Sequence, residues 1–204
     1  MDIFPCTVAI QAGGESTRMG SDKGLMPFLG EPLIQRVIDR VAKLGAEIIV
    51  TTNQPSHYPF VKARLVRDVF PGTGALGGLY TALSAARYPL VAVVACDMPF
   101  AKAELFSALL AVLIENAADA VVPQTGAGYE PLHAVYRREA CLPAIRAVMD
   151  AGERRLITWF PLVTTLTFCE DQIAPHDPHG TAFLNVNTPE QLREAEALAL
   201  SQVE

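Results

Sequence analysis

The opening of the chain constrains its fold more than any other stretch. A short apolar run over 8–10 has the composition of a buried strand and gives way to the glycine pair Gly13 and Gly14. A polar loop follows, in which Arg18 and Lys23 carry positive charge. Glycines let the backbone turn sharply and leave its N–H groups open to an approaching anion. A strand that ends in such a loop is typical of α/β folds that hold nucleotide phosphates beyond the strand's carboxyl end.

The order of apolar segments predicts a mostly parallel sheet. A helix is expected to open at 31–34, with Pro32 in its first turn, and to stop at Gly45. A β-branched strand over 47–52 follows, which completes a parallel crossover unit. The remaining expected strands lie at 64–67, 90–96, 120–123, 130–136 (antiparallel), 163–168 and 182–186, and the remaining helices run to about 86 and over 102–117, 138–150 and 189–200. The last helix is expected to begin with Thr188 as its cap.

Asp97 is the candidate metal ligand in the sequence. It follows the most continuous apolar run, 90–96, which has the composition of a central strand covered on both faces. A carboxylate at that point suits Mg²⁺, which proteins commonly hold with one or two carboxylates plus substrate phosphates. The structural alternative is that Asp97 caps the helix beginning near Lys102 or accepts backbone hydrogen bonds in the turn. The phosphate-type loop on the first strand favours the metal role.

Other polar positions leave two interpretations open. Asn53, after the strand at 47–52, is equally a ligand contact or a turn residue. The glycine-rich loop over 71–78 can close on a nucleobase or ribose, or serve as a connector, and it has neither dinucleotide-binding nor P-loop spacing. Arg154 and Arg155 can clamp a phosphate, although composition favours solvated side chains. His133 lies in a mainly apolar strand, where packing is favoured over a role as a base.

Composition excludes several classes of function. A chain of 204 residues fits a single domain with a sizeable core, and the net charge of −6 argues against broad nucleic-acid binding. Its four cysteines are scattered without a CxxC pair, which predicts free, mostly buried thiols and neither a zinc knuckle nor disulfides. No apolar run approaches the roughly 18 residues of a membrane span, and no secretory signal opens the chain. We therefore expect a cytoplasmic protein with no membrane partner.

The segment over 11–33 resembles the signature of the MobA family, the molybdenum cofactor guanylyltransferases. The family pattern is approximately LAGGxSxRMGxDKxLxxxxGxPL, and this chain reads QAGGESTRMGSDKGLMPFLGEPL. Two positions differ from the family, because Gln11 replaces leucine and Ala75 replaces proline in the glycine-rich loop. The resemblance continues at Asn53, at Asp68 with the PGxG loop, and at 96–99, 130–132, 152–155 and 183–189.

The resemblance implies one Rossmann-like domain over 1–204, a three-layer α/β sandwich with a mostly parallel, partly mixed sheet. It also implies transfer of GMP from GTP to molybdopterin, or to its molybdenum-loaded form, with release of pyrophosphate. Mg²⁺ on Asp97 would bridge the nucleotide phosphates, while Arg18 and Lys23 would neutralise their charge. Transient contact with proteins of molybdenum cofactor biosynthesis or with client molybdoenzymes would follow. The implied binding residues are Gln11, Ala12, Gly13, Gly14, Lys23, Asn53, Asp68 and Asp97 for the nucleotide, and Arg154, Arg155, Asn185 and Asn187 for the pterin.

Three other functions stay open at this point. A cytidylyltransferase of the same cofactor usually has AAG where this chain has 12–14, and a sugar-phosphate nucleotidyltransferase tends to be longer, with a GxGTRM motif. A non-catalytic protein that delivers the cofactor is the third. The charged trio of Arg18, Lys23 and Asp97 argues against that last class, because a scaffold needs no such charges at strand ends.

Overall fold

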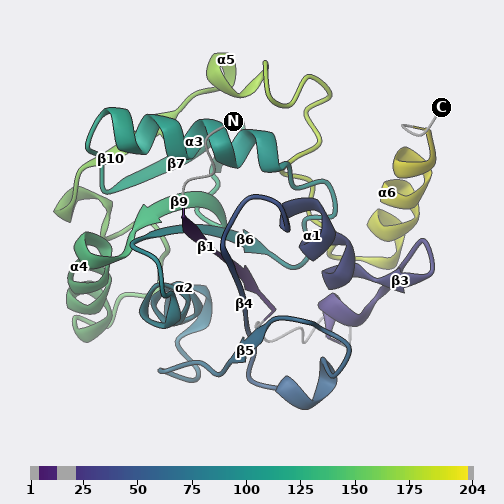
Figure 1. Cartoon of the computed structure of the whole chain (residues 1–204), viewed down its shortest axis with the longest axis horizontal. Coiled ribbons are helices and arrows are strands. Elements are labelled where there is room, and N and C mark those ends of the chain that lie inside the picture. The colour runs from purple at the N-terminus through teal and green to yellow at the C-terminus, as the bar shows by residue number, and fades with distance from the viewer. Residues whose placement is uncertain (1–4, 13–21, 202–204) are drawn as a thin grey trace.

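The computed structural model describes residues 5–12 and 22–201, which form a twisted sheet between two layers of helices (Figure 1). The eight strands run in the order β10-β7-β9-β6-β1-β4-β5, with β8 paired to β7. In chain order they are β1 (Cys6–Gln11), β4 (Glu47–Thr51), β5 (Arg64–Val66), β6 (Leu90–Ala95), β7 (Ala120–Thr125), β8 (Gly128–Tyr129), β9 (His133–Arg137) and β10 (Thr165–Phe168).

Strand β1 is central and pairs in parallel with β4 on one side and β6 on the other. Strand β9 runs antiparallel to both of its neighbours, β6 and β7, and β10 is parallel to β7. The expected α/β fold with a mostly parallel, partly mixed sheet is therefore confirmed. Because β1, β4 and β6 are parallel, their carboxyl ends share one edge of the sheet.

Two buried clusters fill the space between the sheet and its helices. On one face Val8 and Ile10 of β1 pack with α1 (Leu33–Val41), α3 (Ala103–Glu115) and the short α5 (Glu170–Ile173). On the other face Ala9 packs with α2 (Gly74–Ala85) and α4 (Arg138–Asp150). Successive strand residues point to opposite faces, so an uninterrupted apolar strand supplies both clusters.

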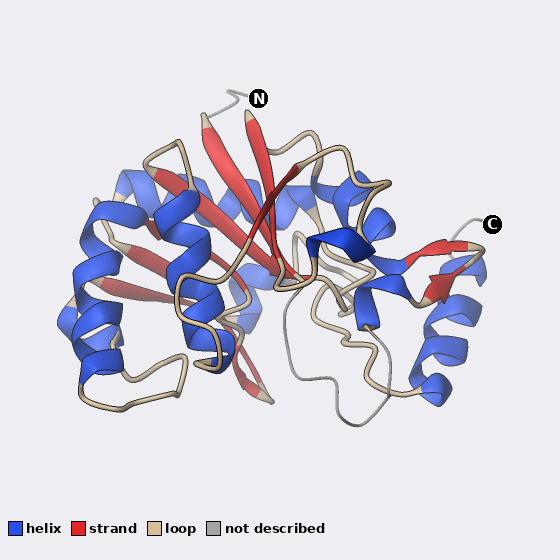
Figure 2. Cartoon of the chain, turned by 90° about the horizontal axis from the view of Figure 1, so that it is seen from below, coloured by secondary structure: helices blue, strands red, loops and turns tan. Residues whose placement is uncertain are grey.

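A third cluster joins the segment before α1 to the C-terminal helix of the described residues. The hairpin β2 (Pro27–Phe28) and β3 (Glu31–Pro32) packs against α6 (Pro189–Ser201), as Figure 2 shows at its right. Phe28 and Phe100 meet edge to face within it, with ring centroids 6.2 Å apart. No helix in the described ranges is long and apolar enough to cross a membrane.

Two sequence predictions about secondary structure are wrong. Residues 31–32 form strand β3, and helix α1 begins at Leu33. Residues 182–186 form no strand, because Ala182 and Val186 bury in different clusters, one against the sheet and one against α6. The backbone N–H groups of that segment bond outside the sheet ladders instead: the Ala182 N–H donates to Asp177 Oδ2 (2.8 Å) and the Val186 N–H donates to the Asp97 carbonyl (2.9 Å).

The other predicted elements are confirmed within a few residues. Helix α4 has the predicted bounds, and the predicted antiparallel strand at 130–136 is observed as β9. The N–H of Gln191 donates to Thr188 Oγ1 (3.2 Å), which confirms Thr188 as the cap of α6. The thiols of Cys6, Cys96 and Cys141 are free and buried, whereas that of Cys169 is exposed.

His133 is a core residue, as the packing interpretation predicted. Its side chain is fully buried, its ring stacks on Phe106 with centroids 4.3 Å apart, and it meets Phe183 at 4.9 Å. Neither ring nitrogen has a hydrogen-bond partner within the described residues. Burial lowers the pKa of His133 from 6.5 to about 3, so the ring is neutral at physiological pH.

His133 should make the free energy of unfolding depend on pH. Below pH 6.5 the unfolded chain binds a proton at His133 that the folded chain does not bind until about pH 3. Stability should therefore fall as the pH drops through this window, with a contribution of up to about 1.4 kcal/mol per pH unit. Urea unfolding of His133→Phe across these pH values should lack that slope. The exposed His179→Phe should retain it, and a slope unchanged in His133→Phe would contradict the assignment.

Candidate active site

The predicted site residues follow the strands that end at one edge of the sheet. The Ala12 N–H donates to the Thr51 carbonyl (2.9 Å), and the Cys96 N–H donates to the Gln11 carbonyl (3.0 Å). These bonds extend the ladders just past the ends of β1, β4 and β6. Residues 11–12, 53 and 97 therefore emerge side by side. Gly13, Gly14 and Arg18, which were also predicted for this site, lie outside the described residues.

Lys23 joins two predicted residues that are distant in sequence. Its Nζ lies 3.1 Å from Asp97 Oδ2 and also donates a short hydrogen bond to Asn187 Oδ1. The lysine side chain is 26% exposed and the aspartate side chain 15%, so the pair is shielded yet reachable. An ammonium group has three N–H donors, and two are used here. Among residues 5–12 and 22–201 the third donor has no partner, so it could bind an anion that enters the site.

Asp97 does not serve as a helix cap. Helix α3 has Lys102 at its N-cap position, with no side-chain hydrogen bond there. The Asp97 carboxylate instead faces Lys23 through Oδ2, and no described residue bonds to Oδ1. The free oxygen could ligate a hard cation. No group of three or more His, Cys, Asp or Glu side chains within 5–12 and 22–201 could enclose a metal. This sparse set fits Mg²⁺, which retains waters and takes ligands from phosphates.

Asn53 and Asp68 form a polar pair at the ends of the neighbouring strands β4 and β5. Asn53 Nδ2 donates to Asp68 Oδ2 (2.8 Å), and the Asp68 N–H donates to Asn53 Oδ1 (3.3 Å). Burial raises the pKa of Asp68, an effect that the hydrogen bond from Asn53 opposes. Asn53 is exposed, so the pair can offer both donors and acceptors to a ligand.

The glycine-rich loop enters α2 beside the end of β1. Gln11 is buried, and a Cβ on Gly78 would come within 2.9 Å of Gln11 Oε1. Glycine at 78 is therefore what allows the Gln11 amide to lie against the helix. The Gln11 Nε2 has no hydrogen-bond partner in the described part of the chain. Gln11 is one of the two positions that differ from the family pattern, and its side chain is buried against helix α2.

Arg154 and Arg155 follow helix α4, which ends at the same edge of the sheet. Helix α4 runs antiparallel to α2: at its start Arg138 Nη2 donates to the Ser84 carbonyl (3.3 Å), and further along the Arg146 guanidinium lies over the Phe70 ring (4.7 Å). Residues 154–155 follow α4 and are exposed, and within the described residues neither pairs with a carboxylate. Asn185 is exposed as well. Of the predicted pterin residues, only Asn187 contacts the Lys23–Asp97 pair.

Asp22 and Tyr58, to which sequence reasoning assigned no role, lie directly beside Lys23. The Tyr58 hydroxyl donates to Asp22 Oδ1 (2.5 Å), and the Gly24 N–H donates to the same oxygen (3.2 Å). Asp22 belongs to the signature segment, which could have drawn attention to it. Tyr58 lies outside every motif, and only the folded chain brings it there.

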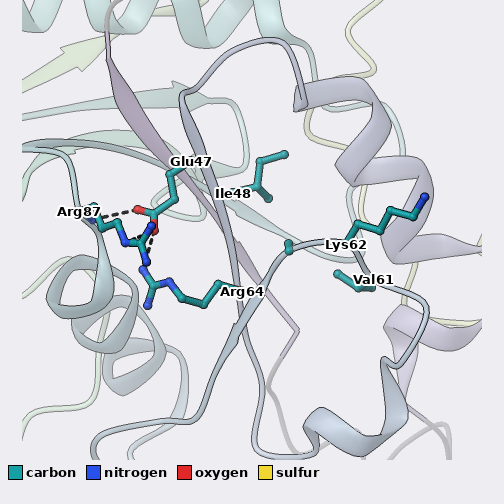
Figure 3. Close-up of a pocket in the computed structure, with 7 residues that line it drawn as sticks. Glu47, Ile48, Val61, Lys62, Arg64 and Arg87 are labelled. Carbon is teal, nitrogen blue, oxygen red and sulfur yellow. Dashed lines mark hydrogen bonds and ion pairs between the residues drawn. The ribbon is translucent and has the colours of Figure 1, made fainter.

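A hollow of about 470 Å³ at the opposite edge of the sheet does not resemble an active site. Figure 3 shows the side chains of Arg64 and Arg87 directed at the carboxylate of Glu47, the first residue of β4. That carboxylate also accepts hydrogen bonds from Thr7 Oγ1 (2.7 Å) and from the Arg87 N–H (2.9 Å). Both carboxylate oxygens have partners within the protein, so Glu47 links the starts of β1, β4 and β5.

Comparison with known proteins gives a consistent result. Residues 8–164 match the family model described as MobA-like NTP transferase domain. A probable molybdenum cofactor guanylyltransferase of Chloroflexus aggregans is 37% identical over 199 residues, covering 92% of each chain. One of Pelotomaculum thermopropionicum is 34% identical over 197 residues, covering 97% of this chain and 95% of the relative.

The fold matches a solved structure closely. Molybdopterin-guanine dinucleotide biosynthesis protein A from Archaeoglobus fulgidus superposes with a TM-score of 0.84, covering 96% of this chain and 99% of that protein at 24% identity. At this identity the likeness concerns the fold.

Proposed function

Because this chain belongs to the MobA-like NTP transferase family, we propose that it transfers GMP from GTP to molybdopterin or its molybdenum-loaded form. The observation that carries the proposal is the cluster of Lys23, Asp97 and Asn187 at the edge of the sheet where β1 and β6 end. Relatives that share more than 30% of their residues with most of this chain bear the name molybdenum cofactor guanylyltransferase, which supports the same substrates.

The chemistry requires one bond to form and one to break. An oxygen of the terminal phosphate of molybdopterin attacks the α-phosphorus of GTP, and the bond from that phosphorus to the bridging oxygen of pyrophosphate breaks. The attacking phosphate is already an anion at neutral pH, so no general base is needed. Catalysis of this kind consists mostly of positioning and electrostatic stabilisation. Lys23 would supply both, through the N–H that neither Asp97 nor Asn187 occupies, and Arg18 would add a second positive charge.

Asp97 would hold Mg²⁺ through the carboxylate oxygen that Lys23 leaves free. When bound there, the ion supplies neutralisation of charge on the nucleotide phosphates. The pairing with Lys23 keeps the Asp97 side chain directed at the site in advance. The negative charge of the phosphates would thus be neutralised in part by Mg²⁺ held on Asp97 and in part by the fixed ammonium group of Lys23.

The remaining predicted residues would bind the two substrates from either side. Asn53 and Asp68 would hold the guanosine, since their side chains are paired and accessible. The exposed residues at the end of α4 and before α6 would face the pterin. The backbone of the residues at and just after the end of β1 would line the nucleotide; these are Gln11, Ala12, Gly13 and Gly14. The residues on the pterin side would be Arg154, Arg155, Asn185 and Asn187.

Calorimetric titration with GTP, CTP and ATP in the presence of Mg²⁺ tests this assignment. We expect a clear preference for GTP, by about tenfold or more in Kd, because a site that hydrogen-bonds one base leaves buried polar groups unpaired with another. The Asp68→Asn variant should weaken GTP binding, whereas Asp39→Asn, on an exposed stretch of α1 remote from the pair, should not. A preference for CTP would move the assignment to the cytidylyltransferases. Binding of none of the three would favour a delivery protein.

A further inference from the structure

We propose that Tyr58 is a positioning residue for the transfer reaction: its hydroxyl group fixes Asp22, and Asp22 fixes the backbone that carries Lys23. The inference rests on the proposed function, because it concerns the lysine assigned there to the phosphates. It assigns a role to a side chain outside the signature segment.

The geometry forms a short chain of contacts. Tyr58 is fully buried and follows the 3-10 helix η2 (Pro55–His57). Its hydroxyl donates to Asp22 Oδ1, the same oxygen that accepts the Gly24 N–H (3.2 Å). Asp22 is thereby the N-cap of the 3-10 helix η1 (Lys23–Leu25), whose first residue is the lysine. The side chain of Asp22 is held from one side by its own helix and from the other by Tyr58.

The backbone at Gly24 is shaped around this tyrosine. A Cβ on Gly24 would lie 2.8 Å from Tyr58 Oη and 3.3 Å from Tyr58 Cε1. Real Cβ atoms do not approach an oxygen that closely, so any larger residue would push the hydroxyl away from Asp22. The absence of a side chain at 24 thus allows the contact that Tyr58 makes.

The hydroxyl is suited to a permanent donor role. Burial raises the pKa of Tyr58 far above its ordinary value, and the hydrogen bond to Asp22 raises it further, so the group keeps its proton. A hydrogen bond to an ionised carboxylate is stronger than one between neutral groups. The second oxygen of Asp22 lies 3.8 Å from His57 Nδ1. With Oδ1 shared by two donors, Asp22 is better placed to support Lys23 than to ligate a metal.

The contact also links the two halves of the proposed site. Tyr58 lies in the segment between β4 and β5, which begins near Asn53, and Asn53 is hydrogen-bonded to Asp68 just beyond β5. Asp22 and Lys23 lie on the phosphate side. A single hydroxyl group therefore joins the segment assigned to the nucleoside with the residues assigned to its phosphates.

Steady-state kinetics of Tyr58→Phe test this role, since the variant removes only the hydroxyl. We expect kcat for pyrophosphate release from GTP and molybdopterin to fall about tenfold while the KM for GTP changes less than about twofold, because a displaced group loses transition-state contacts first. The matched control is Tyr136→Phe, which removes another buried hydroxyl, one that donates to the Pro131 carbonyl (2.6 Å). It should lower the melting temperature and leave kcat unchanged. A Tyr58→Phe variant that also lost only stability would overturn the proposal.

A double variant gives a sharper result. Gly24→Ala should lower kcat because its methyl group displaces the Tyr58 hydroxyl. Adding Tyr58→Phe removes the atom that the methyl group strikes, so the double variant should be no slower than Gly24→Ala alone. This non-additivity is expected only if both changes act on the same contact. Effects on kcat that simply multiplied would refute the shared mechanism.

A measurement without turnover separates this inference from the proposed function. The Gly24 N–H is tied to Asp22, so its hydrogen exchange, followed by NMR, should quicken in Tyr58→Phe and stay unchanged in Tyr136→Phe. Wild-type protein that released no pyrophosphate would refute the proposed function, and Gly24 exchange would still report on the contact. Unchanged exchange in Tyr58→Phe would overturn the positioning role whatever the activity.

Discussion

Replacement of Lys23 by alanine should lower kcat for pyrophosphate release about 10²–10³-fold, which is the loss seen when a preorganised donor to a developing negative charge is removed. Lys23 already holds two oxygen partners, Asp97 and Asn187, so its ammonium group needs little reorganisation when a phosphate arrives. Alanine removes that group and leaves the Asp97 carboxylate without its cation. The KM for GTP should change much less, because the proposed contact strengthens as charge develops on the phosphates.

Two further variants make the Lys23 result specific. Lys43→Ala removes an exposed lysine just beyond α1 and should leave kcat unchanged. Lys23→Arg keeps the charge, but a planar guanidinium group does not replace a compact ammonium group between two fixed oxygens, so activity should recover only in part. The melting temperature of Lys23→Ala should stay near that of the wild type, since the side chain is partly exposed. Turnover within tenfold of wild type would remove Lys23 from the proposed mechanism.

Replacement of Asp97 by asparagine should abolish turnover that depends on Mg²⁺. Asparagine has the size of aspartate and can still accept a hydrogen bond from Lys23, so the fold should be retained. It lacks the charge that a hard cation requires. We expect kcat to fall by about 10³-fold or more, with no recovery as the Mg²⁺ concentration is raised.

The control for Asp97 is Asp150→Asn, which changes an exposed carboxylate at the end of α4 that pairs with Arg146. It should affect neither turnover nor its Mg²⁺ dependence. Calorimetric titration of Mg²⁺ into each variant with GTP bound separates loss of the metal from loss of the nucleotide. Asp97→Asn with normal Mg²⁺-dependent turnover would disprove the metal assignment, although its contact with Lys23 would remain.

Much of the fold was predictable because its signals are local. The apolar run that became β6 and the helix predicted over 138–150 are both signalled by neighbouring residues, and both were predicted nearly to their bounds. Residues 182–186 gave a misleading signal. Their apolar residues suit a strand, but Ala182 and Val186 are drawn into different clusters, a division that depends on where α6 packs.

The site was predictable to the extent that strand order dictates it. Parallel neighbours share an edge, so the proximity of Asn53 to Asp68 and of residue 97 to the end of β1 follows from the topology. Asn187 arrives through an irregular segment, and only the family resemblance pointed to it. The buried contact of Tyr58 could not be foreseen, because its hydroxyl group meets Asp22 only when the loop after β4 has folded onto the start of η1.

The hydrogen bond between Lys23 and Asn187 spans 164 residues and has a consequence for the order in which the protein matures. Synthesis proceeds from the N-terminus, and a domain generally folds as a unit. Strands β1 and β6, which precede Lys23 and Asp97 in the chain, are made well before Asn187. The set of oxygen partners around the ammonium group is therefore complete only after Asn187 has been synthesised. The geometry around Lys23 thus depends on a late segment of the chain as well as on the early strands.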